Sequence, residues 1–270
     1  MRTYIFANQK GGVGKTTTAV NVAAAMADWG FRVLLVDIDP QSNATTSLGF
    51  DPRRLSPSSY ELLLGEEPPQ AVIRRTRWPG LDLLPASPAL AGATVALHAL
   101  TDARERLLRL RGALAEVEGY DYLLLDAPPS LGLLTLNGLA AADGVIVPVQ
   151  CEYLALEGLS QLMHTVDLVR RGVNPALTLR GLVLTMYDRR TMLSRQVAEE
   201  VQRHFPRRLF PLVVPRSVRM SEAPSFGEPG IFYAPRSSAA KAYRKLTRLI
   251  LTGDGVPPER LPAQEGEEAE

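Results

Sequence analysis

Apolar runs of strand length alternate with helical patterns along most of this 270-residue chain. The first helical stretch, 16–29, is followed by Gly30, and another helical pattern spans 237–253. Continuous apolar strands separated by helices are typical of a parallel sheet with both faces covered. The pattern therefore predicts one α/β domain with a doubly wound, mostly parallel sheet and helices on both faces. The seven predicted strands are 3–8, 32–39, 81–87, 120–128, 144–150, 179–187 and 208–215.

Two segments interrupt this pattern. Residues 51–80 are rich in Pro, Arg and Glu, and we expect them to form a surface excursion from the domain. The stretch 254–270 reads "DGVPPERLPAQEGEEAE". It has few of the apolar residues that packing requires, so we expect it to be disordered. We therefore divide the chain into one α/β domain, residues 1–252, and an acidic tail, residues 253–270.

The stretch "QKGGVGKTT", which begins at Gln9, lies between the first predicted strand and the first predicted helix. Gly14, Lys15 and Thr16 match the end of the phosphate-loop pattern G-x-x-x-x-G-K-[ST], but Gln9 replaces its first glycine and Lys10 follows. Glycines let backbone N–H groups point at phosphate oxygens, and the following helix adds its positive end. Lys15 is expected to bridge the β- and γ-phosphates of ATP, and the Thr16 hydroxyl to bind Mg²⁺ directly. The expected nucleotide contacts in this loop are Gln9, Lys10, Gly11, Gly12, Val13, Gly14, Lys15, Thr16 and Thr17.

Three aspartates stand at the predicted carboxyl ends of strands. Asp37 and Asp39 end one apolar run, and Asp126 ends the run "YDYLLLD". Ligands of open parallel sheets bind beyond these strand ends, so all three carboxylates should face the glycine-rich loop. Asp126 occupies the place of a Walker-B aspartate, near Mg²⁺ and its waters. For Asp39 we favour polarising the attacking water and holding Mg²⁺ through water, and a structural capping role is the alternative.

Charge is distributed unevenly, although the net charge is only +1. Residues 180–250 hold 14 Lys and Arg against 5 Asp and Glu, whereas the rest of the chain holds 16 against 24. A basic third with a net charge of +9 points toward a polyanion. A solvated, Arg-rich helical surface explains the same composition, and composition alone leaves both interpretations open.

Several classes of protein are excluded by what the sequence lacks. The single cysteine, Cys151, rules out a disulfide framework, a four-cysteine metal site and an iron–sulfur protein. The sequence has no run of about 18 apolar residues, so no membrane span is expected. The chain enters its first strand without the long apolar core of a signal peptide. We therefore expect a cytoplasmic protein.

Five stretches together resemble one family: "KGGVGKTT", "LLVDIDPQSNAT", "YDYLLLDAPPSLG", "LTMYDRRT" and "VPRSVRMSEAPSFG". They resemble the deviant Walker-A P-loop ATPases, the family of ParA, Soj and MinD, and within it the chromosomal ParA/Soj branch. The resemblance runs from about residue 3 to residue 250. It implies a slow ATPase that uses ATP and Mg²⁺ and forms a homodimer when ATP is bound. It also implies non-specific binding to duplex DNA of the nucleoid, and a ParB-like centromere-binding partner that stimulates hydrolysis during chromosome or plasmid segregation.

The resemblance also assigns catalytic roles. Lys10 matches the family's signature lysine, which reaches across a two-fold axis to the nucleotide of the other subunit. Such a lysine supplies a cation to the phosphates in trans, as an arginine finger does. The expected catalytic residues are therefore Lys10, Lys15 and Asp39.

Other family positions concern DNA and the base. Arg190 and Arg219 match the arginines that hold DNA, and the adjacent Arg189 leaves open which of the two neighbours meets phosphate. The adenine base is expected near Pro215 and Ser217, held by their backbone groups. Arginine contacts to phosphate would give sequence-independent, salt-sensitive binding.

Two other functions share this fold. A MinD-like positioning ATPase needs a C-terminal amphipathic helix that enters membranes, but this chain ends in "PAQEGEEAE", which anionic lipid repels. A small-molecule ATP-dependent ligase needs neither Lys10 nor a basic face. ATP-dependent binding to plain duplex DNA distinguishes a partitioning ATPase from such a ligase.

Overall fold

The computed structural model describes residues 1–152 and 155–263. Within these residues, eight strands form one sheet in the order β3-β4-β2-β5-β1-β6-β7-β8, and β3 is the strand that pairs antiparallel. The predicted parallel sheet is therefore confirmed. The strands are β1 (Arg2–Phe6), β2 (Val33–Asp37), β3 (Arg74–Arg75), β4 (Leu81–Leu84), β5 (Tyr122–Asp126), β6 (Gly144–Gln150), β7 (Thr178–Tyr187) and β8 (Leu209–Pro215).

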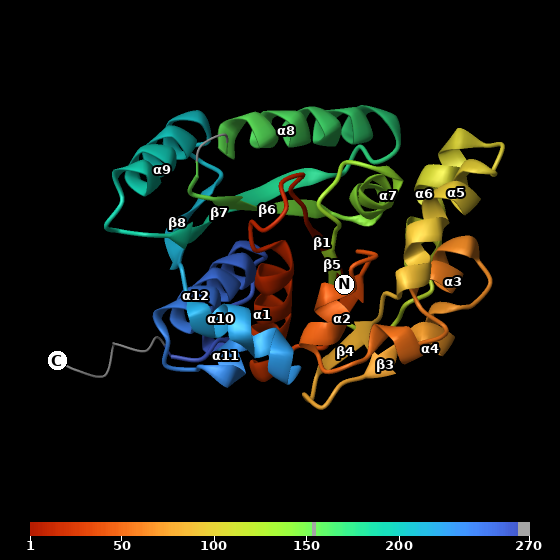
Figure 1. Cartoon of the computed structure of the whole chain (residues 1–270), viewed down its shortest axis with the longest axis horizontal. Coiled ribbons are helices and arrows are strands. Elements are labelled where there is room, and N and C mark those ends of the chain that lie inside the picture. The colour runs from red at the N-terminus through yellow and green to blue at the C-terminus, as the bar shows by residue number, and fades with distance from the viewer. Residues whose placement is uncertain (153–154, 264–270) are drawn as a thin grey trace.

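Helices cover both faces of this sheet (Figure 1). Helices α7, α8 and α9 lie on one side, and α1 lies with α10, α11 and α12 on the other. The longer helices are α1 (Lys15–Asp28), α6 (Ala103–Leu114), α7 (Leu133–Ala141), α8 (Ala155–Gly172), α9 (Met192–His204) and α12 (Ser238–Gly253). The shorter helices are α2 (Asn43–Ser47), α3 (Ser59–Leu64), α4 (Pro69–Val72), α5 (Ala93–His98), α10 (Val218–Glu222) and α11 (Gly230–Tyr233).

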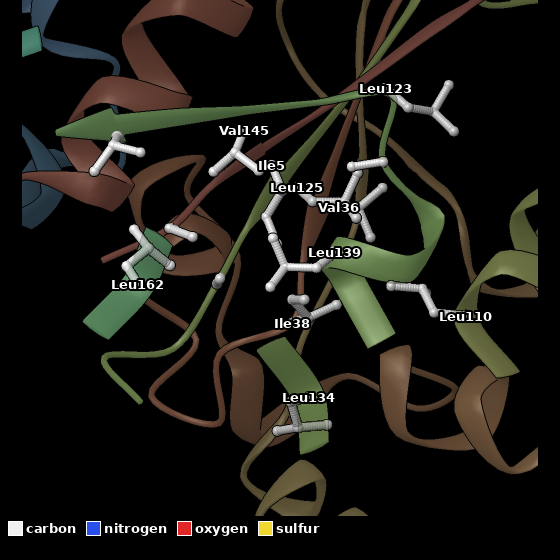
Figure 2. Packing of buried hydrophobic residues seen from close by; sticks show 14 of the residues in the cluster. Ile5, Val36, Ile38, Leu110, Leu123, Leu125, Leu134, Leu139, Val145 and Leu162 are labelled. Carbon is white, nitrogen blue, oxygen red and sulfur yellow. The ribbon is translucent and has the colours of Figure 1, made fainter. Parts of the chain in front are cut away.

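Two hydrophobic cores lie on opposite faces of the sheet. In β1, Ile5 packs into the core beneath α7 and α8, whereas Tyr4 and Phe6 pack into the core beneath α1 and α12. Figure 2 shows Ile5 among side chains of neighbouring strands and of α7, including Leu139. Because successive side chains of a strand point to opposite faces, a sheet covered on both sides needs apolar residues at every position. This requirement explains the continuous apolar runs of the sequence.

The carboxyl ends of the central strands lie side by side. In the parallel register, Asp37 at the end of β2 is opposite Asp126 at the end of β5, and Asp126 is opposite Phe6 at the end of β1. The glycine-rich loop leaves β1 at this same edge and leads into α1. The sheet therefore gathers the loop and the carboxylates at one place.

The segment 51–80 is more than a surface excursion. It contains α3, α4 and β3, and Leu62, Leu63 and Val72 are buried in the core. A capping box starts α3. The Ser58 hydroxyl accepts a hydrogen bond from the Tyr60 N–H, and the Glu61 carboxylate accepts one from the Ser58 N–H. The many charged residues mask a short amphipathic pattern, whose buried residues join the same core as Leu110 and Leu114 of α6.

The first residues after α12 are packed, contrary to the predicted disorder of 254–270. Asp254 is buried, and Leu261 is buried against the core beneath α1. The Asp254 carboxylate accepts hydrogen bonds from the Tyr4 and Tyr122 hydroxyls and pairs with Arg180. This buried ion pair orders the segment despite its low apolar content. The remaining predicted tail, 264–270, lies outside the described residues.

Candidate active site

The glycine-rich loop is shaped by two glycines in the left-handed region. Gly12 has φ 74° and Gly14 has φ 83°, conformations that a residue with a Cβ rarely adopts. The Thr185 hydroxyl of β7 donates to the Val13 carbonyl oxygen at 2.8 Å, which ties the middle of the loop to the sheet. Gly14 accepts from the Thr18 N–H and hydroxyl, and so begins α1. The loop is thus a fixed turn at the N-terminus of a helix, where anions bind.

Lys15 points back over the loop that precedes it. Its side chain is buried, and Nζ donates to the Lys10 carbonyl oxygen at 3.2 Å. Burial lowers the pKa of Lys15, while the nearby Asp126 and Asp39 carboxylates act in the opposite direction. The Lys15 ammonium is thereby held beside the Asp126 and Asp39 carboxylates, next to the glycine-rich loop.

The two strand-end carboxylates differ in how they are paired. Asp126 is fully buried, and neither of its oxygens has a hydrogen-bond partner among the described residues. Burial raises the pKa of Asp126 well above its ordinary value; the neighbouring Asp37 raises it further, and Thr16 nearby opposes the shift. Burial also raises the pKa of Asp37, to about 7, although Asp37 accepts three hydrogen bonds. A buried carboxylate without a partner is costly, which marks Asp126 as a group that a cationic ligand would complete.

The glycine loop and Lys15 border a cleft of about 360 Å³, and Asp37 and Asp126 are not among its lining residues. Gly12, Gly14, Lys15, Thr16, Thr17 and Asp39 line it, so the structure brings together six of the predicted site residues. Sequence reasoning missed the remaining lining residues, which are Gln41, Asn43, Thr46, Ser47, Pro129, Met186, Met220, Ser221 and Pro224.

The missed residues differ in whether the sequence signals them. The polar run "DPQSNATTS" directly follows the strand-end aspartates, so its Gln41, Asn43 and Thr46 were within reach of the same strand-end rule. Met186 has φ 51°, a left-handed conformation that is unusual for a residue other than glycine. That strain at the end of β7 turns the chain into the cleft, and nothing in the local sequence signals it.

Lys10 does not reach into the cleft of its own chain. Its Nζ lies 3.0 Å from Glu152 Oε2, and its side chain keeps 39% of its exposure. Its backbone N–H donates to the Asn8 side chain at 3.1 Å, which fixes the start of the loop. Gln9 lies against Gly158 of α8, and a Cβ at Gly11 would meet Pro129 at an ordinary 3.8 Å.

Comparison with known proteins places this loop and cleft in a family. A family model described as an AAA domain matches residues 1–179. The chromosome-partitioning ATPase Soj of Thermus thermophilus is 52% identical over 251 residues, covering 93% of this chain and 96% of Soj. The sporulation initiation inhibitor protein Soj of Bacillus subtilis is 51% identical over 244 residues, covering 90% and 95%. The chain belongs to the ParA/Soj family of chromosome-partitioning ATPases.

Solved structures agree on the fold. A structure named cobyrinic acid a,c-diamide synthase, from Mycobacterium smegmatis with bound ADP and magnesium, has a TM-score of 0.83 and 40% identity, covering 97% of this chain and 98% of that one. The expected ParA/Soj resemblance and the P-loop fold are thus confirmed. The roles of individual residues remain predictions.

The two residues that the ParA/Soj resemblance places near the base lie elsewhere than the cleft. Pro215 ends β8 and lines a separate cavity of about 810 Å³ with Arg189, Arg190 and Arg216. Ser217 precedes α10 without lining the loop cleft. The cleft side of this segment is formed by Met220, Ser221 and Pro224. The base-binding role of Pro215 and Ser217 stays a prediction.

The predicted DNA-binding arginines are exposed and make local ion pairs. Arg190 is 88% exposed and holds the pKa of Asp188 at about 2 through its hydrogen bonds to that carboxylate. Arg219, 65% exposed, pairs with Glu222 at 3.2 Å. Arg189 is exposed and lines a groove of about 560 Å³ with Lys241 and Lys245. Exposed pairs of this kind contribute little stability, so both arginines can exchange a carboxylate for a phosphate at small cost.

Two features that the described residues lack concern metals and membranes. Among them, no three His, Cys, Asp or Glu side chains cluster as a ready-made metal site. Mg²⁺ commonly binds through one or two carboxylates together with phosphates and waters, which suits a single unpartnered Asp126 beside a phosphate loop. None of the described helices combines the length and apolar character needed to span a bilayer.

Proposed function

We propose that the chain is an ATP-driven switch that closes into a dimer and binds duplex DNA. The observation that carries the proposal is a cleft lined by Lys15 and the glycine loop, with the unpartnered Asp126 carboxylate near enough to Lys15 to act on its pKa. A cation and an open carboxylate beside loop N–H groups fit Mg²⁺-bound phosphates. ATP and Mg²⁺ are therefore the proposed ligands of this cleft.

Each cleft residue takes a distinct part in this proposal. Lys15 neutralises the β- and γ-phosphates, and the loop N–H groups orient them. Thr16 would hold Mg²⁺ directly, and Asp39 and Asp126 would hold it through water; when bound, the ion neutralises charge that develops on the phosphates. Asp39 orients and polarises the attacking water. Burial raises the pKa of Asp39, which strengthens it as a proton acceptor.

The proposed dimer rests on Lys10 and Gly12. Lys10 points away from its own cleft to Glu152, so its ammonium is available to a second chain. A Cβ built on Gly12 meets no atom of the described residues within 4 Å, its two chain neighbours aside, so the space in front of the loop is open. We propose that a second copy occupies that space and that each Lys10 reaches the phosphates bound by the other copy. ATP binding and dimerisation are then coupled.

The proposed DNA face comprises Arg190, Arg219 and Arg189. They lie in a chain third with a net charge of +9, and Arg190 and Arg219 are themselves 88% and 65% exposed. The proposal extends to a nucleoid-bound dimer whose hydrolysis a ParB-like centromere-binding protein stimulates. The MinD-like alternative lacks a supporting observation among the described residues.

A small-molecule synthase is the second candidate, because the Mycobacterium smegmatis structure carries that name at 40% identity. The curated relatives named ParA or Soj are more similar, at 48–52% over most of the chain. A synthase cleft would accept a second substrate beside the phosphates, and it would need no lysine directed away from them. Lys10 therefore favours the partitioning ATPase.

Light scattering of the Asp39→Ala variant tests the proposed switch. With ATP and Mg²⁺ the variant should bind without hydrolysing, and its mass should double. Adding Lys10→Ala should return the protein to monomer while ATP remains bound. Adding Arg54→Ala instead, at an exposed arginine paired with Asp51, should leave the dimer intact. If the Asp39→Ala variant binds ATP but stays monomeric, the proposed switch is wrong.

A further inference from the structure

Asp37 is the one strand-end carboxylate to which the proposed function gives no role. It is completely buried at the end of β2, beside Asp126 of β5. Its Oδ2 accepts from the Thr45 N–H at 2.9 Å and from the Thr45 hydroxyl at 2.7 Å. Its Oδ1 accepts from the Asp39 N–H at 3.1 Å. Both oxygens are therefore occupied by this chain's own donors.

The donors to Asp37 come from the segment that lines the cleft. Asp39 Oδ1 accepts from the Gln41 N–H at 2.9 Å, and the Asp39 carbonyl accepts from the Ser42 N–H at 2.8 Å. Ser42, with φ 54°, turns the chain into α2. Asp37 thus binds this turn at both its ends, at Asp39 and at Thr45.

Thr45 extends the connection to the next strand. It is buried, and its hydroxyl accepts from the Ala86 N–H at 3.0 Å while donating to Asp37. Ala86 lies just beyond β4, the neighbour of β2 in the sheet. The turn that carries Asp39 is therefore attached to two strand ends rather than to one.

We propose that Asp37 and Thr45 are positioning residues for Asp39, fixing the carboxylate that orients the attacking water. The inference rests on the proposed function, since it assumes that Asp39 acts on that water. Displacing an acting group by about 1 Å can cost about 100-fold in rate, so such anchoring is needed. Asp37 touches neither the cleft nor its expected ligand, and acts through Asp39.

The hydrogen-bond chemistry makes the proposal specific. Asparagine at position 37 keeps the volume but replaces one accepting oxygen by an NH₂ donor. In either orientation that NH₂ faces an N–H donor, at Thr45 or at Asp39, so one end of the turn is released. Valine at position 45 keeps the shape and removes the hydroxyl, whereas serine keeps the hydroxyl.

Steady-state ATPase kinetics of Asp37→Asn, Thr45→Val and Thr45→Ser test this. We expect Asp37→Asn and Thr45→Val to lower kcat about 10- to 100-fold. KM for ATP should change less than twofold, because the phosphate loop is untouched. Thr45→Ser should retain most of the wild-type kcat. The matched control is Thr247→Val, in which a buried threonine of α12 loses a hydroxyl that bonds only to Tyr243 O of its own helix; its kcat should equal that of wild type.

The outcomes separate the two proposals. A wild-type protein that does not hydrolyse ATP overturns the proposed function and this inference with it. An active wild type with unchanged kcat in Asp37→Asn and Thr45→Val overturns only the inference. The same holds if kcat and KM change together and Thr45→Ser gives no rescue, because that describes a general loss of structure. If Thr45→Val fails to fold, the kcat and KM of Asp37→Asn decide alone.

Discussion

A buried carboxylate lies at each end of strand β5, and the two carboxylates differ in their partners: Asp254 has three, and Asp126 has none among the described residues. At its first residue, the Tyr122 hydroxyl donates to Asp254, which also accepts from Tyr4 and pairs with Arg180 at 3.3 Å. At its last residue, Asp126 is fully buried, and its carboxylate accepts no hydrogen bond among the described residues. The first end of the strand is therefore electrostatically complete, and the second is not.

This difference separates stability from function within one strand. A buried carboxylate with three partners holds the chain together, as Asp254 attaches the segment after α12 to β1 and β5. A buried carboxylate without partners costs stability, and a fold retains it where a ligand supplies the missing contacts. Asp126 lies beside Lys15 and the glycine loop, where such a ligand is expected.

The largest expected effect is on ligand binding at the incomplete end. Lys15→Ala removes the cation beside Asp126 and Asp39. Loss of one member of a buried charge contact costs about 2–5 kcal/mol, so ATP affinity should fall by roughly 30-fold or more. Isothermal titration measures this loss, with Lys245→Ala, on the groove by α12, as the control that should bind normally. Unchanged affinity in Lys15→Ala would remove the phosphate-loop assignment.

The next effect is on stability at the complete end. Asp254→Ala leaves Arg180 and two tyrosine hydroxyls without their acceptor, and should lower the free energy of unfolding by about 3 kcal/mol. Urea denaturation measures the change. Glu259→Ala, at an exposed residue of the same segment, should stay within about 0.5 kcal/mol of wild type. Equal stability of the two variants would mean that the Asp254 contacts do not hold the segment.

A smaller effect of opposite sign is expected for Asp126→Asn. Removing an unpartnered buried charge should raise the ligand-free stability by about 1 kcal/mol. The pH dependence of the stability tests the same buried carboxylates. Burial raises the pKa of Asp126 and raises that of Asp37 to about 7, so above pH 4 the folded state holds protons that the unfolded state has released. Stability of the ligand-free protein should therefore fall as pH rises from about 4 to 7.

Asp126→Asn should make this fall with pH shallower, because one of the two coupled groups no longer titrates. Urea denaturation at several pH values, without nucleotide or Mg²⁺, measures both slopes. A wild-type stability that rises over the same pH range would show that these carboxylates are ionised at no cost in the folded state.

The smallest expected effect on stability comes from breaking a surface ion pair. Arg219→Ala breaks a surface pair with Glu222 and should change stability by less than about 0.5 kcal/mol. If Arg219 contacts DNA, the same variant should lower the salt slope of DNA binding by about 0.9 per lost phosphate contact. Arg54→Ala, which breaks a similar i,i+3 pair with Asp51, should leave the slope unchanged. Equal slopes in both variants would exclude Arg219 from the DNA face.

The sequence predicts the incomplete end of β5 far better than the complete one. The glycines, Lys15 and Asp126 follow local rules, because a phosphate loop and a strand-end aspartate are short patterns with fixed chemistry. The Asp254 contacts join residues 74 to 250 positions apart, so no local pattern signals them, and the segment is instead predicted to be disordered. Met186 enters the cleft through a strained backbone, which likewise depends on tertiary structure.

The strands, the expected adenine site and Asp37 also differ in how well the sequence predicts them. The continuous apolar runs predict the strands because burial on both faces leaves a mark at every position. The base-side residues Pro215 and Ser217 follow from resemblance alone, and they lie outside the cleft that the loop forms. The sequence does not predict the hydrogen bonds of Asp37, because the local pattern of a strand-end aspartate is the same whether or not its carboxylate has partners.

Thermal unfolding with a non-hydrolysable ATP analogue tests most directly whether the unpartnered carboxylate belongs to a ligand. The transition temperature is measured for wild type and Asp126→Asn, with and without Mg²⁺. We predict that analogue and Mg²⁺ together raise the transition temperature of wild type more than the analogue alone, and that this Mg²⁺-dependent increment is absent in Asp126→Asn. An increment of equal size in both proteins would contradict the account.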